Sequence, residues 1–319
     1  MELKGLHHIS IFTDNARKNF DFYTKVLGLR LVKKTVNQDD PYTYHLYYAD
    51  ETGSPGTTVT FFEVPNIAPN RPGRNQISAM GLRVPNDAAL DYWDERLDGF
   101  QVFHSKGEMQ FGRKVIRFKD ADGLTIYLVS DEKNQGVAGG QPWEGSPVPP
   151  EFAIQGLGPV RFSVYKKEKT DHVLTKVMGF KRVGTYEDKE RFLTVYQTGA
   201  GGTGAEIHLE ARPDLEQRNL GAGGVHHVAF RVADDAEMME WNERIAEANY
   251  PNSGFIDRYY FHSLYFREPN GLLFELATDG PGFRTDFEVE HGTYVELPPK
   301  FEGRRAEIEA HLTPLDTDI

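Results

Sequence analysis

Three residues of the sequence, His8, His227 and Glu275, are of types that bind divalent metal ions. The chain has no cysteine, which excludes disulfides, thiolate ligands and a cysteine nucleophile and leaves His, Asp and Glu as candidate ligands. Two imidazoles and one carboxylate leave coordination positions open for a substrate and O2, and this donor set is typical of non-heme Fe(II) enzymes. We therefore predict one mononuclear metal site, with Mn(II) or Zn(II) as alternatives to Fe(II).

These positions can be tested because the chain repeats itself. The segment VPNDAALDYWDERL, residues 84–97, returns as VADDAEMMEWNERI at residues 232–245. With the same offset, FKDADGLTIYLVSD at residues 118–131 returns as FREPNGLLFELATD at residues 266–279. Self-similarity of this kind indicates a repeat architecture. We predict two tandem halves, each made of two related units.

Each unit has the pattern of a strand, a helix and three further strands. In the first unit, His8 and Ser10 alternate with Ile9 and Ile11, which is the period-2 signature of a strand. A helix, expected to be capped by Asp14, and three strand-like runs follow. This βαβββ pattern predicts an α+β fold in which four modules form two barrel-like halves.

The same pattern predicts how the chain is divided. The N-terminal pair of modules is expected in residues 1–134 and the C-terminal pair in residues 153–281. Between them, the Gly- and Pro-rich segment 135–152 is expected to be a linker. Residues 282–319 are expected to form a C-terminal tail with a short helix.

The repeat allows each candidate ligand to be compared with its equivalents in the other units. The first-strand and last-strand positions are, in unit order, His8, Ala79, Pro159 and His227, and Thr60, Tyr127, His208 and Glu275. Units one and four together supply two histidines and a carboxylate, so we predict that these units lie side by side. The middle units are then a metal-free half, in which His208 is structural because its counterpart is proline.

Strand periodicity also predicts where the side chains point. An apolar row follows His227 along its strand, so His227, and likewise His8, is expected to face a concave pocket. Glu275 alternates with apolar neighbours, and a carboxylate on such a buried strand needs a cationic partner. By the same alternation, His7 and His226 are expected to face away from the adjacent ligands, as supporting or surface residues.

The composition excludes several classes of protein and partner. A formal net charge of -12 argues against nucleic-acid binding, which needs clustered Lys and Arg. The hydrophobic and charged fractions are ordinary for a globular protein, and no segment has the length and apolarity of a signal peptide or membrane span. We expect a cytoplasmic enzyme that acts on a small molecule, with a homo-oligomer left open.

The motifs HHIS, HHVAF and NGLLFEL, together with the βαβββ repeat, resemble the vicinal oxygen chelate superfamily, which contains glyoxalases, antibiotic-resistance proteins and extradiol dioxygenases. From GLHHIS to the tail GPGFRTDFEVE…LPPKFEGRRAEIEAHL, the chain resembles the hydroquinone ring-cleaving dioxygenase branch. The resemblance implies that His8, His227 and Glu275 hold Fe(II). It also implies oxidative, extradiol-type opening of a para-dihydroxylated aromatic ring by O2, as in aromatic degradation or detoxification.

The resemblance further implies five polar residues around the substrate: His7, Ser10, His226, Arg258 and Tyr265. Ser10 stands where a threonine is common in the relatives. Arg258 and Tyr265 are expected to orient the substrate and to stabilise developing negative charge.

Two other functions fit the same residues. A glyoxalase-like isomerase or lyase would use Zn(II) or Ni(II) as a Lewis acid, but such sites usually have four protein ligands and the fourth corner here is Thr60. A binding protein that captures a small aromatic molecule without turnover is the other alternative. The sequence leaves open the ring substituents, the cleavage position and the choice between Fe(II) and Mn(II).

Overall fold

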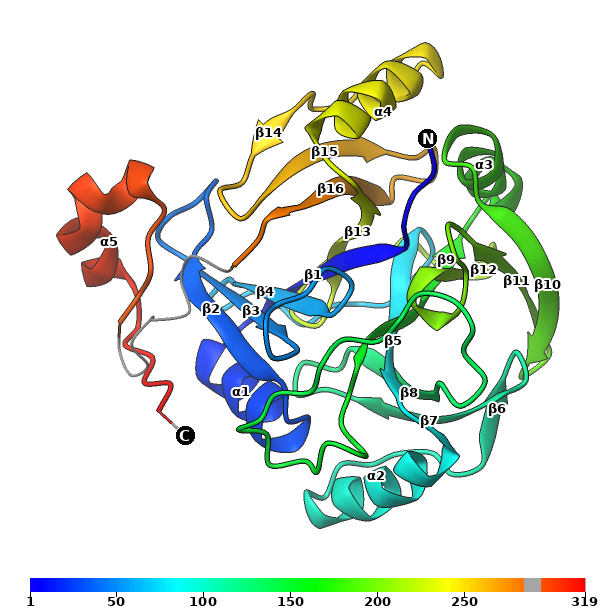
Figure 1. The fold of residues 1–319 in the computed structure, drawn as a ribbon, viewed down its shortest axis with the longest axis horizontal. Helices are drawn as coiled ribbons and strands as arrows, with labels where there is room; N and C mark the ends of the chain where they lie inside the picture. Colours follow the sequence, from blue (N-terminus) through cyan, green and yellow to red (C-terminus); the bar gives the residue numbers. More distant parts are fainter. Residues whose placement is uncertain (284–293, 319) are drawn as a thin grey trace.

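The strands of the chain form two eight-stranded sheets, each curled around its own concave face (Figure 1). The structure is a computed structural model that describes residues 1–283 and 294–318. Both sheets are mixed, and the four strands of each module are neighbours in one sheet. The predicted α+β fold of four βαβββ modules in two barrel-like halves is confirmed.

The first sheet combines the two ends of the chain. Its strands, in spatial order, are β14 (Ile256–Asp257), β15 (Phe261–Arg267), β16 (Leu273–Pro281), β13 (Val225–Val232), β1 (Leu6–Thr13), β4 (Thr58–Glu63), β3 (Tyr44–Ala49) and β2 (Arg30–Val36). Strands β1 and β13 pair antiparallel at its centre. Modules one and four therefore share one sheet, as the placing of the candidate ligands predicted.

The second sheet is built from the two middle modules. Its strands, in spatial order, are β10 (Lys181–Asp188), β11 (Arg191–Gln197), β12 (Glu206–Ala211), β9 (Gly156–Val164), β5 (Gln76–Val84), β8 (Thr125–Ser130), β7 (Arg113–Lys119) and β6 (Glu108–Gln110). The rings of Phe162 on β9 and Phe274 on β16 stack with centroids 5.4 Å apart, within a hydrophobic core that the two sheets share.

The strand register confirms the alignment of the four repeats. In every module the last-strand position pairs in parallel with the residue two places after the first-strand position. These pairs are Ser10 with Thr60, Gly81 with Tyr127, Arg161 with His208, and Ala229 with Glu275. The positions compared in the sequence are therefore equivalent in space.

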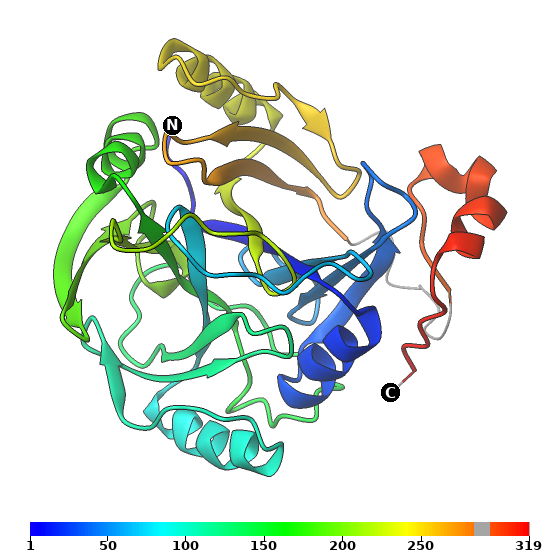
Figure 2. The same cartoon turned by 180° about the vertical axis from the view of Figure 1, so that it is seen from behind.

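Helices lie around the outside of the sheets, as the views from the front and from behind both show (Figures 1 and 2). They are α1 (Ala16–Asp21), α2 (Asp87–Gly99), α3 (Lys167–His172), α4 (Asp235–Glu247) and, in the tail, α5 (Arg305–His311). Helices α1 and α3 each continue into a π-helical turn, at Phe22–Val26 and Val173–Val177. None of the described helices is long and apolar enough to cross a membrane.

The start of α1 differs from the prediction. Asn15, not Asp14, caps the helix, because its side-chain oxygen accepts a hydrogen bond from the Lys18 amide at 2.9 Å. Asp14 lies one residue too early and instead pairs with the Lys18 ammonium group at 2.7 Å. In α4, Asp234 caps the helix and Trp241 lies on its buried face.

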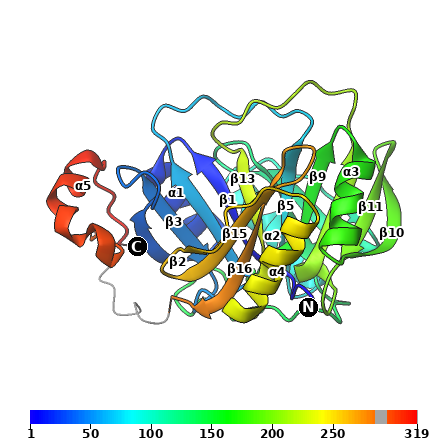
Figure 3. The same ribbon diagram turned by 90° about the horizontal axis from the view of Figure 1, so that it is seen from above.

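Two long segments, residues 64–75 and 212–224, carry the chain from one sheet to the other. They run beside each other over the molecule in the view from above (Figure 3), and bridge pairs join Pro69 to Ala222 and Arg71 to Asn219. The two crossover segments are thus held to each other by backbone pairing.

Residues 135–152 lie between β8 and β9 and contain no helix or strand. The domain division proposed from the sequence stays a prediction. The C-terminal tail packs on the first sheet, since the Glu296 amide donates to the Lys34 carbonyl at 3.0 Å. Part of the tail used for the resemblance, residues 284–293, lies outside the described residues.

Candidate metal centre and substrate pocket

Three buried donor atoms meet on the concave face of the first sheet. Nε2 of His8 on β1 and Nε2 of His227 on β13 lie 3.0 and 2.8 Å from Oε2 of Glu275 on β16. The two nitrogens are 3.3 Å apart. The structure thus brings together the three residues that the repeat singled out, from the central strands of modules one and four.

The spacing of these atoms fits a metal ion. Donor atoms about 2.1 Å from a metal and at right angles to each other would lie about 3.0 Å apart. Oε2 of Glu275 is buried and receives no hydrogen bond from the described residues, whereas Oε1 accepts one from Ser263 at 2.5 Å. Burial opposes ionisation of Glu275, but His8 and His227 hold the pKa of this carboxyl well below its usual range. An ionised, unpartnered oxygen facing two imidazoles is the arrangement that a cation would complete.

A chain of hydrogen bonds determines which nitrogen of His8 is free. The Thr278 carbonyl can only accept, so the contact of 3.0 Å with Nε2 of His7 places a hydrogen on that nitrogen. Burial lowers the pKa of His7 to about 3, so the ring is neutral and its Nδ1 accepts from Nδ1–H of His8 at 2.9 Å. A neutral His8 then presents a bare Nε2 to the site, the form that binds metal.

The fourth module has the equivalent pair. Nδ1 of His226 lies 2.8 Å from Nδ1 of His227, and burial lowers the pKa of His226 to about 3. Both candidate ligands are therefore contacted, on the nitrogen away from Glu275, by the histidine that precedes them.

The prediction that His7 and His226 face away from the ligands is wrong, and two β-bulges are the reason. Between β1 and β13 the register shifts between Leu6 and His8, which leaves His7 unpaired, and again between Ser10 and Ile11, which leaves His226 unpaired. A bulge breaks strict alternation and re-aims the extra side chain. Each bulged histidine can therefore contact its neighbour.

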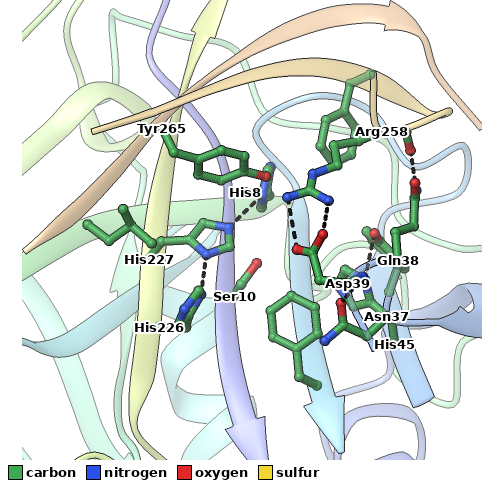
Figure 4. A pocket seen from close by; sticks show the side chains of 14 residues that line it. His8, Ser10, Asn37, Gln38, Asp39, His45, His226, His227, Arg258 and Tyr265 are labelled. Atoms are coloured by element: carbon green, nitrogen blue, oxygen red, sulfur yellow. Dashed lines mark hydrogen bonds and ion pairs between the residues drawn. The ribbon is translucent and has the colours of Figure 1, made fainter. Parts of the chain in front are cut away.

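A cavity of about 230 Å³ opens beside the donor atoms (Figure 4). Its lining comes from β1, β3, β4, β13, β15, β16 and the loops at their ends. The lining residues are His8, Ser10, Asn37, Gln38, Asp39, His45, Tyr47, Phe62, His226, His227, Arg258, Phe261, Tyr265 and Leu273. Four of the five predicted substrate-contacting residues are among them, and His7 is buried behind His8.

Arg258 and Tyr265 lie together on one wall of the cavity. The Arg258 guanidinium is 5.3 Å from the centroid of the Tyr265 ring and forms two bonds, of 3.0 and 3.1 Å, with the Asp39 carboxylate. Burial, and then the charge of Glu275, raise the pKa of Tyr265 well above its usual value. Its hydroxyl is therefore a neutral group that can donate a hydrogen bond.

A second group of polar side chains on the wall includes two residues that the sequence did not predict, His45 and Tyr47. Oγ of Ser10 lies 2.7 Å from Oγ1 of Thr60, Nε2 of His45 lies 3.0 Å from the same oxygen, and Tyr47 lies 2.8 Å from Nδ1 of His45. The signal was present in the strand TYHLYYA, where His45 and Tyr47 alternate with buried Leu46. Asn37, Gln38 and Asp39 lie in a loop, whose position the sequence did not indicate.

In module three, the residue equivalent to Glu275 is His208, and both of its ring nitrogens have hydrogen-bond partners. His208 contacts Glu206 at 2.6 Å and Tyr186 at 2.8 Å, and Arg113 forms two hydrogen bonds with Glu206. Pro159 cannot contribute a ligand there. This geometry agrees with the expected structural role of His208.

The repeats, the two sheets and the paired donor residues can be compared with known proteins. The chain matches the model of the family described as the glyoxalase/bleomycin resistance protein/dioxygenase superfamily over residues 5–128 and 168–276. The chain belongs to this superfamily. The resemblance stated from the sequence motifs is confirmed, and members of this superfamily similar to the chain over nearly its whole length are known.

One relative in the superfamily is MhqA of Bacillus subtilis (strain 168), described provisionally as a ring-cleaving dioxygenase. It is 49% identical over 99% of this chain and 100% of its own length. Another, from Sphingobium indicum, is named chlorohydroquinone/hydroquinone 1,2-dioxygenase and is 32% identical over 96% of this chain and 95% of its own length.

Solved structures agree with this assignment. A protein of Bacillus subtilis, described provisionally as a dioxygenase, superposes with a TM-score of 0.89 at 36% identity and covers 99% of both chains. Glyoxalase I of maize shares the fold, with a TM-score of 0.62 at 14% identity over 87% of this chain and 93% of its own. Membership of the superfamily and the donor set together imply a divalent metal.

Proposed function

We propose that the protein is an Fe(II)-dependent dioxygenase that opens hydroquinone-type aromatic rings with O2 in an extradiol-type reaction. The observation that carries the proposal is the donor set of His8, His227 and Glu275: Oε2 of Glu275 has no hydrogen-bond partner among the described residues, and both histidines line a cavity with aromatic walls. The relative named chlorohydroquinone/hydroquinone 1,2-dioxygenase supports the reaction class.

His8, His227 and Glu275 would hold the metal ion. When bound, iron supplies the redox chemistry that allows triplet O2 to react with a closed-shell phenol. The bare Nε2 that the His7 contact gives His8 supports this assignment. The contact with His7 thus leaves the His8 nitrogen that faces Glu275 available as a ligand.

The cavity supports a substrate of one aromatic ring. Pockets for drug-sized ligands have volumes of roughly 300–1,000 Å³, and this cavity, at about 230 Å³, is smaller. Phe62, Phe261 and Leu273 supply apolar walls that would pack on the ring and exclude water. Tyr265, held neutral, would donate a hydrogen bond to a substrate oxygen as negative charge develops on it.

The residue of module one that is equivalent to Glu275 argues against a glyoxalase-like isomerase. This residue is Thr60, and the Thr60 hydroxyl is already in contact with Ser10 and His45. A fourth anionic ligand is therefore missing from the position where the repeat would place it. The site has three candidate protein ligands, as a reaction that also needs O2 requires.

The experiment is metal analysis and O2 uptake on protein loaded with Fe(II) without oxygen. We expect about one iron per chain, O2 consumption with methylhydroquinone, and loss of both in Glu275→Ala. The matched control is Thr60→Val at the equivalent corner, which should keep the iron because Thr60 is not a ligand in this proposal. Iron-loaded protein that consumes no O2 with any of a panel of hydroquinones and catechols would contradict the proposal.

A further inference from the structure

An ion pair lies at the open side of the cavity, between the exposed side chain of Asp39 and the mostly buried side chain of Arg258. Among the described residues that line the cavity, Asp39 and Arg258 are the only Asp, Glu, Lys or Arg side chains. The two guanidinium nitrogens Nη1 and Nη2 of Arg258 each contact one carboxylate oxygen of Asp39, at 3.0 and 3.1 Å. Figure 4 shows the two groups facing each other across the cavity wall.

The pair joins the two metal-binding modules. Asp39 lies in the loop between β2 and β3 of module one, and Arg258 directly follows β14 of module four. The loop is held in place beside Arg258, since Nε2 of Gln38 donates to the Arg258 carbonyl at 2.6 Å and the side chain of Asn37 accepts from the Asp39 amide at 3.0 Å. The hydrogen bond from Arg258 lowers the pKa of Asp39, so this carboxyl is ionised at neutral pH.

An arginine in a substrate pocket is the side chain best suited to bind a carboxylate, because its planar fork matches both oxygens. Here Asp39 already occupies that fork. A carboxylate on the substrate would have to displace Asp39 or approach an anion, whereas an uncharged ring meets a neutral pair. The Arg258 guanidinium is therefore paired with Asp39 and lies over the Tyr265 ring.

We propose that Asp39 is a specificity-determining residue that restricts the enzyme to hydroquinones without an ionised ring substituent and excludes carboxylated rings such as 2,5-dihydroxybenzoate. This inference rests on the proposed function, because it names the substrate class of the same site. It assigns the discrimination to charge, so it predicts that a neutral ring of the same shape is accepted.

The test compares 2,5-dihydroxybenzoate with 2,5-dihydroxybenzamide, which has nearly the same shape and no charge. Both are measured by anaerobic calorimetric binding to the Fe(II)-loaded protein and by kcat/KM for O2 uptake. The parent and its variants hold the same metal, so any preference of the metal for the carboxylate cancels when the carboxylate-to-amide ratio of a variant is compared with that of the parent. Asp39→Asn is the test variant. Asp40→Asn, which makes the same charge change one residue away and outside the cavity lining, is the matched control.

We expect the parent and Asp40→Asn to prefer the amide, and Asp39→Asn to reduce that preference by about 2- to 5-fold, because the Asp39 side chain is largely exposed and solvent screens an exposed charge. An equal preference in Asp39→Asn and the parent, or a parent that accepts both probes alike, would overturn the inference. Ring opening of methylhydroquinone without the charge preference leaves the proposed function intact and removes this inference. The charge preference in binding without ring opening of any probe supports Asp39 and removes the proposed function.

Discussion

Ser10 on β1 lies directly opposite Thr60 on β4, and their hydroxyl oxygens are 2.7 Å apart at the corner that Glu275 occupies in module four. The repeat thus places two equivalent positions at one site. Glu275 supplies a charge at one of them, and Thr60 joins a hydrogen-bonded network at the other. Each position leads to a different prediction.

Replacing Thr60 by valine keeps the branched shape and removes the hydroxyl that joins Ser10 to His45. We expect iron content to stay the same and kcat on methylhydroquinone to fall about 10-fold, because Ser10 loses the partner that holds it at the cavity wall. Iron analysis and O2 uptake on the same preparation check this. An unchanged kcat would show that the network is only structural.

Replacing His7 by phenylalanine keeps a ring and removes the acceptor for His8. We expect the affinity for Fe(II) or Zn(II) to fall about 10- to 100-fold, the usual effect of losing a partner that orients a ligand. Calorimetric metal titration is the measurement. The control is Ser78→Ala, since Ser78 is skipped by the equivalent register shift in the second sheet and should leave the affinity unchanged.

Metal binding should stabilise the folded chain. A metal at 100 times its Kd adds about 2.7 kcal/mol to the free energy of unfolding, so removal with a chelator should lower Tm by several degrees. Glu275→Ala should lose this increment. In His208→Gln, which changes the equivalent corner of the second sheet, the increment should persist even though the hydrogen bonds to Glu206 and Tyr186 are lost. A metal effect of equal size in Glu275→Ala would disprove the assignment of Glu275.

Asp120, in the turn after β7, should make stability depend on pH away from the metal site. Burial raises its pKa from 3.8 to about 6, so the folded state keeps a proton that the unfolded state has lost. Its contribution to stability is complete below pH 3.8 and falls as the pH rises to 6, by about 3 kcal/mol.

Asp120→Asn removes this titration and keeps a side-chain oxygen that can accept the hydrogen bond that the Leu124 amide donates to Asp120 at 2.9 Å. Measured by urea unfolding, the stability of Asp120→Asn relative to the parent should increase between pH 4 and 7. The control is Asp91→Asn on the surface of α2, whose difference from the parent should stay constant. A constant difference for Asp120→Asn would mean that this carboxyl titrates normally in the folded protein.

The fold and the donor set could be predicted because the repeat reveals both the four modules and the equivalent positions within them. Comparing four copies places Glu275 beside His8 and His227 without knowledge of the strand order, and the register of Ala229 with Glu275 agrees. The orientation of His7 could not be obtained in this way. A bulge is a property of two paired strands, and the periodicity of one strand does not reveal it.

The remaining cavity residues show the same limit. His45 and Tyr47 lie on a strand whose alternation was visible, but their contacts with Thr60 depend on which strands are neighbours. Asp39 and Arg258 come from loops about two hundred residues apart in the chain, and no local pattern relates them. Their pairing follows only from the closure of the first sheet by the two ends of the chain.

The pairing of the two ends of the chain in the first sheet also sets the order in which the two sheets can form during synthesis. The ribosome makes His8 near the start of the chain and Glu275 near its end, whereas every strand of the second sheet, from residue 76 to residue 211, is complete long before. The second sheet can therefore form while the first still lacks half of its strands. A chain that has not reached residue 275 lacks one of the three donor groups, so the complete donor set can bind a metal ion only after β16 has been made.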